Sequence, residues 1–371
     1  DGGRFDLPLA LGILAANGAI NPQALNDYEL IGELALTGEL RAIDGVLPAA
    51  LAAKQAGRKM IVPSGNGAEA GLAGSEHIYT ARTLMEVVHH LRGDRILPKA
   101  QSQVDFIDAP MLDMADVRGQ QSARRAMEIA AAGGHHILLI GSPGCGKTLL
   151  ASRLPGILPM ASDEEAIESA AIASVSGRGL DLTRFRQRPF RSPHHTSSAV
   201  ALAGGGTQPK PGEISLAHNG VLFLDELAEW DRKSLEVLRQ PLESGTVSIS
   251  RAANTAEFPA RFQLVAAMNP CPCGWFGDNS GRCRCTADAI ERYRGQLSGP
   301  LLDRTDIHLA MSRISHEELH LNAPLGESSA VIRERVIKAR DRQRQQSGVC
   351  NAHLSQSQLK QLCQLSDGNQ N

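Results

Sequence analysis

Hydrophobic residues form almost unbroken short runs at three places: "HHILLI" (135–140), "GVLFLDE" (220–226) and "FQLVAAMNP" (262–270). Runs of this length without alternation are typical of strands that are buried on both faces of a parallel sheet. Helix-like stretches lie between them, and the clearest, "ADVRGQQSARRAMEIAAAGG" (115–134), closes on two glycines, as helices often do. The pattern therefore predicts an α/β domain with a parallel sheet.

A different pattern fills the first 92 residues. The apolar run "LPLALGILAA" (7–16) is expected to be a buried helix, and the helix-like "AALAAKQAGRK" and strand-like "MIVP" follow further along, which together indicate a small α+β domain. A polar segment with two prolines then reads as a linker, and after about residue 313 the chain becomes polar and helical. The expected organisation is a first domain at 1–94, a linker at 95–112, an α/β core at 113–312 and part of a helical lid at 313–371.

Composition limits the classes of function. The net charge of −2 provides no overall positive field to attract nucleic acid, and 4% aromatic residues argue against a base-stacking surface. The run at 7–16 is too short to span a bilayer and lacks a basic flank, so no membrane association is expected. An odd number of cysteines, seven, in a large chain predicts a reducing, cytoplasmic location. The chain has no initiator Met and begins as if inside a domain, which predicts a fragment trimmed at both ends.

The string "GSPGCGKT" (141–148) carries the clearest chemistry. It fits G-x-x-x-x-G-K-[ST] and lies between an expected strand and helix, the context that this phosphate-binding motif requires. Glycines let backbone N–H groups turn toward phosphate oxygens, Lys147 reaches the β- and γ-phosphates, and Thr148 ligates Mg²⁺. The candidate ATP-binding residues are Gly141, Ser142, Pro143, Gly144, Cys145, Gly146, Lys147, Thr148, Asp225 and Val117.

Polar residues at the ends of the later strands add the elements of hydrolysis. Asp225 can hold the Mg²⁺ shell, and Glu226 beside it can polarise the attacking water. Asn269 follows the third apolar strand, where it can orient the water or sense the γ-phosphate. Arg304 in "SGPLLDRTD" can neutralise transition-state charge, although by spacing alone it reads as a surface arginine.

The order of these motifs resembles that of the AAA+ ATPases. Asp225 lies 78 residues after Lys147, which leaves room for an insertion, as in the helix-2-insert branch with magnesium-chelatase subunits and MCM helicases. The strings "RPFRSPHH", "PGEISLAHNGVLFLDE", "ARFQLVAAMNP" and "LSGPLLDR" resemble more closely the magnesium-chelatase-like family of bacterial competence protein ComM (YifB). The resemblance implies that Arg304 is an arginine finger and that the chains form a ring, expected to be a hexamer. Thr305 stands where the family more usually has an aromatic or aliphatic residue.

The first domain resembles the Lon protease domain through "DGGRFDLPLALGILAANG" and "LTGELRAIDGVLP". The positions after its "DG" are Gly3, Arg4 and Phe5, so the nucleophilic serine of that family is missing, and Lys54 does not match its catalytic lysine. A Ser–Lys dyad needs both members in contact. We therefore expect a degenerate, non-proteolytic domain that serves assembly or ligand binding.

Two C-x-C pairs in "NPCPCGWFGDNSGRCRCT" form a candidate metal site of Cys271, Cys273, Cys283 and Cys285. Four thiolates suit tetrahedral Zn²⁺, but C-x-C is tighter than the usual C-x₂-C knuckle, so four reduced surface cysteines remain an equal interpretation. The other cysteines, Cys145, Cys350 and Cys363, read as structural. His194 and His195 read as packed or polar loop residues rather than ligands.

Three functions compete. The resemblance favours an ATP-driven, ring-shaped motor on single-stranded or branched DNA, a branch-migration helicase of natural transformation. A chelatase-type subunit that drives metal insertion is disfavoured because such subunits lack a Lon-like domain. An ATP-dependent protease is disfavoured because the serine is missing.

The run "ESGTVSISRAANTAEFPARF" (243–262) predicts a β-hairpin just before the third strand, placed like the pore hairpin of MCM rings. Arg251 near its tip and Lys210 in "TQPKPGE" are the candidate DNA-binding residues; the alternative is a surface hairpin with solvated charges.

Overall fold

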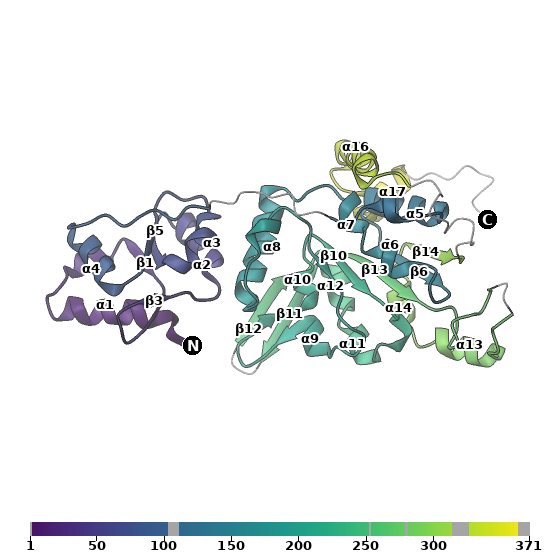
Figure 1. The fold of residues 1–371 in the computed structure, drawn as a ribbon, viewed down its shortest axis with the longest axis horizontal. Coiled ribbons are helices and arrows are strands. Elements are labelled where there is room, and N and C mark those ends of the chain that lie inside the picture. Colours follow the sequence, from purple (N-terminus) through teal and green to yellow (C-terminus); the bar gives the residue numbers. More distant parts are fainter. Residues whose placement is uncertain (1, 103–110, 252–253, 279–280, 314–325, 363–371) are drawn as a thin grey trace. The chain divides into compact units, whose positions relative to one another are not determined.

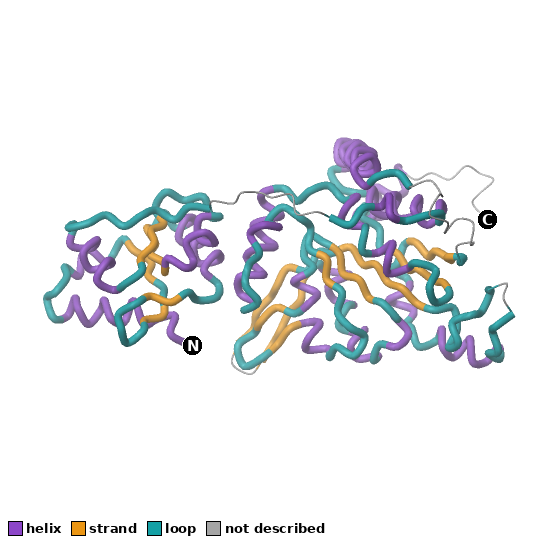
Figure 2. Tube along the Cα trace, viewed as in Figure 1, coloured by secondary structure: helices purple, strands orange, loops and turns teal. Residues whose placement is uncertain are grey.

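The computed structural model describes residues 2–102, 111–251, 254–278, 281–313 and 326–362. Its backbone divides into two units, and each is described by itself. Unit 1 comprises Asp1–Ala109 and Asp163–Arg186, and unit 2 comprises Pro110–Ser162 and Gln187–Asn371. Figure 1 labels their elements along the ribbon, and Figure 2 distinguishes helices, strands and loops. No described helix is long and apolar enough to cross a membrane.

Unit 1 is the small α+β domain that the sequence predicts. Its parallel three-stranded sheet has the order β1-β4-β5, and β2 pairs with β3 in a separate antiparallel ribbon. The strands are β1 (Tyr28–Leu30), β2 (Glu33–Leu34), β3 (Leu40–Arg41), β4 (Lys59–Pro63) and β5 (Ile78–Ala81). The helices are α1 (Asp6–Ala16), α2 (Val46–Gln55), α3 (Gly67–Gly71), α4 (Leu84–Arg92) and α8 (Asp163–Ser176).

Helix α1 corrects one prediction. Leu7 and Leu11 are fully buried, but Leu9 is 65% exposed and Ile13 is 63% exposed. These residues lie on opposite faces because positions four apart share a face of a helix. The helix is therefore buried on one face only, although its sequence is apolar all round.

Helix α8 lies within the range expected for the α/β core but packs on unit 1. Its Ala170 belongs to the same hydrophobic cluster as Leu47 and Ala50 of α2. The Gly45 N–H donates to the Ser174 carbonyl at 3.0 Å, and the Ser174 hydroxyl donates to the Glu69 carboxylate. Polar and apolar contacts together attach α8 to the rest of unit 1.

The segment expected to be a linker, 95–112, begins with ordered backbone pairing. The Thr80 N–H donates to the Pro98 carbonyl at 2.9 Å, and the Ala100 N–H donates to the Ile78 carbonyl at 2.8 Å. Residues 98–100 therefore continue along the edge of β5. Positions 103–110 of this segment lie outside the described residues.

Unit 2 is built on a parallel five-stranded sheet of order β14-β6-β13-β10-β7. Its strands are β6 (Ile137–Gly141), β7 (Phe190–Arg191), β10 (Val221–Leu224), β13 (Gln263–Met268) and β14 (Ile307–Met311). Three of them, β6, β10 and β13, are the predicted apolar runs. The edge strands β7 and β14 were not predicted.

Helices cover both faces of this sheet. One face packs against α5 (Gln121–Gly133), α6 (Lys147–Ala151), α7 (Leu154–Ile157) and α16 (Ser329–Ser347) through a cluster that includes Ile137 and Leu139. The other packs against residues of the remaining helices through a second cluster that includes Leu138, Leu222 and Leu264. Figure 1 shows α5 and α16 on one side of the sheet and α11 and α14 on the other. These remaining helices are α9 (Ala199–Ala203), α10 (Glu213–Leu216), α11 (Arg232–Glu236), α12 (Arg239–Ser244), α13 (Ala287–Arg294) and α14 (Gly299–Leu302). Helix α17 (Gln356–Leu362) follows α16 in the chain and has no buried residue.

Unit 2 also contains two antiparallel ribbons. The hairpin of β11 (Thr246–Arg251) and β12 (Asn254–Pro259) confirms the predicted one, with Thr246 opposite Pro259 and Arg251 opposite Asn254. A shorter ribbon pairs β8 (Gly204–Gly205) with β9 (Lys210–Pro211). The first ribbon runs almost directly into β13.

A largely buried histidine lies at the amino end of β6. His136 Nδ1 accepts a hydrogen bond from the Leu264 N–H at 2.9 Å, so this nitrogen must be unprotonated. Burial lowers the pKa of His136 to about 4; Asp306 opposes this shift, whereas His353 and His135 favour it. The neutral imidazole is therefore part of the folded structure.

This histidine should make unit 2 less stable in acid. Because its pKa is lower in the folded state, the unfolded chain binds the extra proton and stability falls from about pH 6.5 to about pH 4. The shift is worth about 3 kcal/mol in the free energy of unfolding. Urea unfolding at pH 7 and pH 4 should show this loss for the wild type and a smaller loss for His136→Asn, which keeps an acceptor near Nδ1. Equal pH dependence in the two proteins would refute the assignment.

Candidate functional site

The phosphate loop, residues 141–148, joins β6 to α6 as the motif requires. Gly144 and Gly146 have φ of +76° and +94°, a left-handed region that favours glycine. A Cβ added at either position would meet no atom within 4 Å, so the backbone conformation alone demands glycine there. The Cys145 N–H donates to the Ser142 carbonyl at 3.3 Å and closes the turn. Burial raises the pKa of the Cys145 thiol, which keeps it protonated and fits a structural residue.

Lys147 and Asn269, two candidate site residues far apart in the sequence, lie in contact. Lys147 is 9% exposed, and its Nζ donates to the Gly141 carbonyl at 2.7 Å and to the Ser142 carbonyl at 3.3 Å. It also donates to Asn269 Oδ1 at 3.2 Å. The residue that follows β13 is thus linked directly to the lysine of the phosphate loop.

Thr148 and Asp225 form an oxygen pair suited to Mg²⁺. The Thr148 hydroxyl, in α6, donates to Asp225 Oδ2, just after β10, at 2.6 Å. The Trp230 Nε1–H donates to the Asp225 carbonyl at 2.9 Å and fixes the backbone after β10. A hydroxyl and a carboxylate side by side are hard ligands of the kind that Mg²⁺ takes together with phosphate oxygens. These residues therefore fit a Mg²⁺–nucleotide.

Glu226 is held by a residue that sequence reasoning assigned no role. Its backbone has φ of +51°, rare for a non-glycine residue, and its carboxylate Oε2 lies 2.8 Å from His195 Nδ1. His195 follows β7, and its ring lies 4.2 Å from that of His194, centroid to centroid. From the sequence, the histidine pair was interpreted as a packed or polar loop element. Only its position beside Glu226 in the structure indicates a chemical role for His195. His195 can orient the carboxylate that would polarise water.

Removing this hydrogen bond should slow hydrolysis. We expect His195→Ala to lower kcat for ATP about 10- to 100-fold, because a hydrogen bond to a charged group is worth about 1.5–3 kcal/mol. KM should change little, since His195 positions the carboxylate rather than the nucleotide, and His195→Gln should recover part of kcat. Steady-state ATPase kinetics measure both constants. An unchanged or increased kcat in His195→Ala would contradict a positioning role.

Gln120 is a second residue without a sequence signal. It has φ of +49° just before α5, and its Nε2 donates to the Cys145 carbonyl at 3.1 Å and to the Ser312 carbonyl at 2.6 Å. One side chain thus ties the phosphate loop to the end of β14. Val117, a candidate nucleotide-binding residue, is 2% exposed and packs in the core cluster next to α5.

Arg304 lies far from the phosphate loop of its own chain. It precedes β14, whose Ile307 pairs with Ile137 at the amino end of β6, whereas the phosphate loop follows the carboxyl end. Its guanidinium forms an ion pair with Glu243 and donates to the Pro300 carbonyl at 3.0 Å. The structure therefore does not bring Arg304 together with Lys147.

The candidate DNA-binding residues lie on the two ribbons. Arg251 is the last residue of β11, although its side chain lies outside what the structure describes. Lys210 opens β9 and is exposed. Lys54 of unit 1 donates from Nζ to the Ala73 carbonyl at 2.8 Å, and among the described residues no serine hydroxyl pairs with it.

The cysteine loop, residues 270–286 between β13 and α13, brings the candidate zinc ligands together. Sγ of Cys271 lies 3.4 Å from that of Cys273 and 3.9 Å from that of Cys283, and the Cys273 and Cys283 sulfurs are 3.7 Å apart. All four ligand atoms, including that of Cys285, lie within 4.8 Å of one another. Cys363, expected to be structural, lies outside the described residues.

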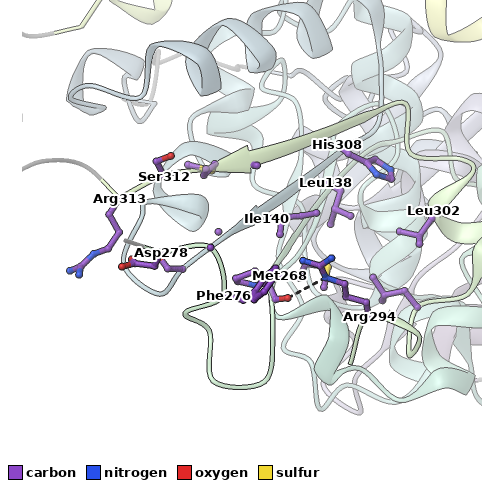
Figure 3. A pocket seen from close by; sticks show the side chains of 17 residues that line it. Leu138, Ile140, Met268, Phe276, Asp278, Arg294, Leu302, His308, Ser312 and Arg313 are labelled. Atoms are coloured by element: carbon purple, nitrogen blue, oxygen red, sulfur yellow. Dashed lines mark hydrogen bonds between the residues drawn. The ribbon is translucent and has the colours of Figure 1, made fainter. Parts of the chain in front are cut away.

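A cavity of about 610 Å³ lies between the cysteine loop and the sheet. Figure 3 shows its walls: Leu138 and Ile140 come from β6, His308 from β14, and Phe276 from the cysteine loop. Gly141 and Ser142 reach its edge, but Lys147, Thr148, Asp225 and Glu226 do not line it. It is therefore a neighbour of the candidate ATP site rather than that site.

Comparisons with known proteins cover nearly the whole chain. Residues 113–319 match the family described as magnesium chelatase, subunit ChlI; residues 1–66 match subunit ChlI of Mg-chelatase, and residues 326–371 match the ChlI C-terminal family. The chain is 49% identical to competence protein ComM of Haemophilus influenzae over 99% of its own length and 73% of that protein. It is 47% identical to YifB of Escherichia coli over 98% of its own length and 72% of that protein. An MCM-type protein of Methanocaldococcus jannaschii is 27% identical over 50% of the chain and 21% of its own length.

Proposed function

Because the chain belongs to the magnesium chelatase ChlI-like family, in its ComM/YifB branch, we propose that it is an AAA+ motor that hydrolyses ATP to move DNA. The name of the Haemophilus influenzae relative supports a role in natural transformation, where the motor would migrate or unwind branched DNA. Lys147 and Thr148 hold the nucleotide and its Mg²⁺, with Asp225. Glu226 polarises the attacking water, and Asn269 connects this site to β13.

The continuity of the hairpin with β13 carries the proposal. β12 ends at Pro259, β13 begins at Gln263, and Asn269 follows β13 directly. Asn269 Oδ1 accepts a hydrogen bond from Lys147 Nζ, so a change at the γ-phosphate would reach the hairpin through this hydrogen bond and along β13. We propose that Arg251 and Lys210 contact the phosphate backbone of DNA from these ribbons. Six copies in a ring would concentrate their charge on a protein whose net charge is only −2.

ATPase rates with single-stranded, duplex and four-way-junction DNA test this function. We expect stimulation by DNA, and we expect the double variant Arg251→Ala, Lys210→Ala to bind all DNA sequences more weakly. The slope of log affinity against log salt should fall by about 0.9 for each phosphate that the variant no longer neutralises. Lys338→Ala, which removes an exposed cation from α16, is the control. Unchanged DNA binding in the double variant would remove both residues from the DNA path.

We also propose that the four cysteines hold one Zn²⁺. A tetrahedral site with Zn–S bonds of about 2.3 Å has sulfurs about 3.8 Å apart. The sulfur separations of 3.4, 3.7 and 3.9 Å fit this spacing. Metal analysis of protein purified without chelator should find about one zinc per chain, and well under one would reject the site.

A further inference from the structure

Most of the described part of the cysteine loop is exposed or half-buried and borders a cavity, and only Pro270, Cys271 and Gly274 in that part are buried. Its residues 276–278 form one wall of the 610 Å³ cavity, whose opposite wall is the sheet. The described part of the loop contains no helix or strand. A segment that buries little apolar surface gains little from the hydrophobic effect, so its position must come from other contacts.

The sulfur cluster and a few arginines provide those contacts. The Phe276 N–H donates to Cys271 Sγ at 3.3 Å, and Arg294 Nε donates to the Pro270 carbonyl at 3.3 Å, drawn as a dashed line in Figure 3. The Arg294 guanidinium lies 5.3 Å from the Phe276 ring centroid, and that of Arg282 lies 4.8 Å from the Trp275 centroid. The four cysteines are the point at which both ends of the loop meet.

The cysteine loop also lies in close contact with the phosphate loop. A Cβ added to Gly274 would lie 2.8 Å from both Cδ and Cγ of Pro143 and 3.8 Å from Cγ of Asn269. Gly274 lies between Cys271 and Cys283 in sequence, one residue after Cys273, so a metal on these sulfurs would fix its position. Asn269, two residues before Cys271, contacts Lys147. The cysteine cluster therefore reaches the phosphate loop by two routes, through Pro143 and through Asn269.

We propose that zinc bound by the four cysteines holds the phosphate loop in its nucleotide-binding geometry, so that nucleotide binding depends on zinc. The inference rests on the zinc site and the ATP site proposed above. With zinc bound, Gly274 supports Pro143, and Asn269 keeps its hydrogen bond to Lys147. Without it, the loop that borders the cavity no longer fixes either residue, and nucleotide is bound more weakly.

Two variants of the full chain test the two parts of this linkage. Cys285→Ser removes one of the four ligands, and we expect it to lose zinc and to bind a fluorescent ATP analogue about 10- to 100-fold more weakly. Gly274→Ala keeps all four cysteines, so it should retain zinc but bind the analogue more weakly. Gly277→Ala is the matched control, because Gly277 has a similar φ of +79° but a Cβ there would meet no atom within 4 Å.

The readouts separate the possible failures. Zinc content, nucleotide affinity and circular dichroism are measured on each protein, so misfolding is recognised, and Cys283→Ser replaces Cys285→Ser if the latter fails to fold. Loss of zinc with unchanged nucleotide affinity would overturn the proposal, as would equal effects of Gly274→Ala and Gly277→Ala. A wild-type protein that binds nucleotide but hydrolyses none would refute the motor function, while the comparison of affinities would still decide the role of zinc.

Discussion

Arg304→Ala is expected to lower kcat for ATP by about 10³-fold or more, because an arginine that neutralises the γ-phosphoryl transition state is worth about that much. In its own chain, Arg304 lies at the amino end of the sheet, and the five residues of β6 span about 16 Å to the phosphate loop. We therefore expect it to act on nucleotide held by a neighbouring copy. Lys147→Ala should be equally inactive, because it removes a charge-assisted hydrogen bond to phosphate.

Mixing the two inactive proteins tests this arrangement. Some interfaces in a mixed ring join an intact Arg304 to an intact Lys147, so ATPase activity should reappear. Glu243→Gln is the control, since it breaks the ion pair of Arg304 but leaves the arginine in place. Mixtures that show only the sum of the two parents would mean that Arg304 does not act between copies.

The second large effect concerns the carboxylate after β10. Glu226→Gln should retain ATP but hydrolyse it about 10²- to 10⁴-fold more slowly, because an amide cannot take the proton from water. Nucleotide affinity should stay near that of the wild type, since Lys147 and Thr148 are untouched. Single-turnover hydrolysis and binding of the fluorescent analogue separate the two quantities.

Glu229→Gln makes the same chemical change three residues along the chain, at an exposed position in the turn after β10. It should hydrolyse ATP at about the wild-type rate. If Glu226→Gln and Glu229→Gln had equal rates, Glu226 would not be the residue that activates water.

The strands at the centre of unit 2 could be predicted because they are buried on both faces. β6, β10 and β13 are continuous apolar runs, and such runs leave few alternatives. The edge strands lack this signal: β7 has two residues, and β14 alternates between exposed and partly buried positions. The hairpin was visible because alternation on both sides of a polar turn is a local property.

The candidate site also contains residues that the sequence could predict and residues that it could not. Contiguous motifs predicted the phosphate loop, Asp225 and Glu226, whereas the spacing of the cysteines left a zinc site and four reduced surface cysteines as equal interpretations. His195 and Gln120 could not be found, because their partners lie far along the chain and a histidine or glutamine in a loop has no pattern of its own. The attachment of α8 to unit 1 is equally non-local, since the sequence of a helix does not show which surface the helix packs on.

Helix α8 belongs to unit 1 but lies in the sequence between two segments of unit 2, so the two units are interleaved along the chain. The polypeptide passes from one unit to the other three times, near residues 109, 162 and 186. No single cut can separate them, and a shortened chain starting at Pro110 would still carry α8, with Ala170 and Ser174 stripped of their partners. Proteolysis at the first crossing alone should leave both fragments joined by that helix. A gene encoding only the ATPase unit would need an internal deletion as well as a new start.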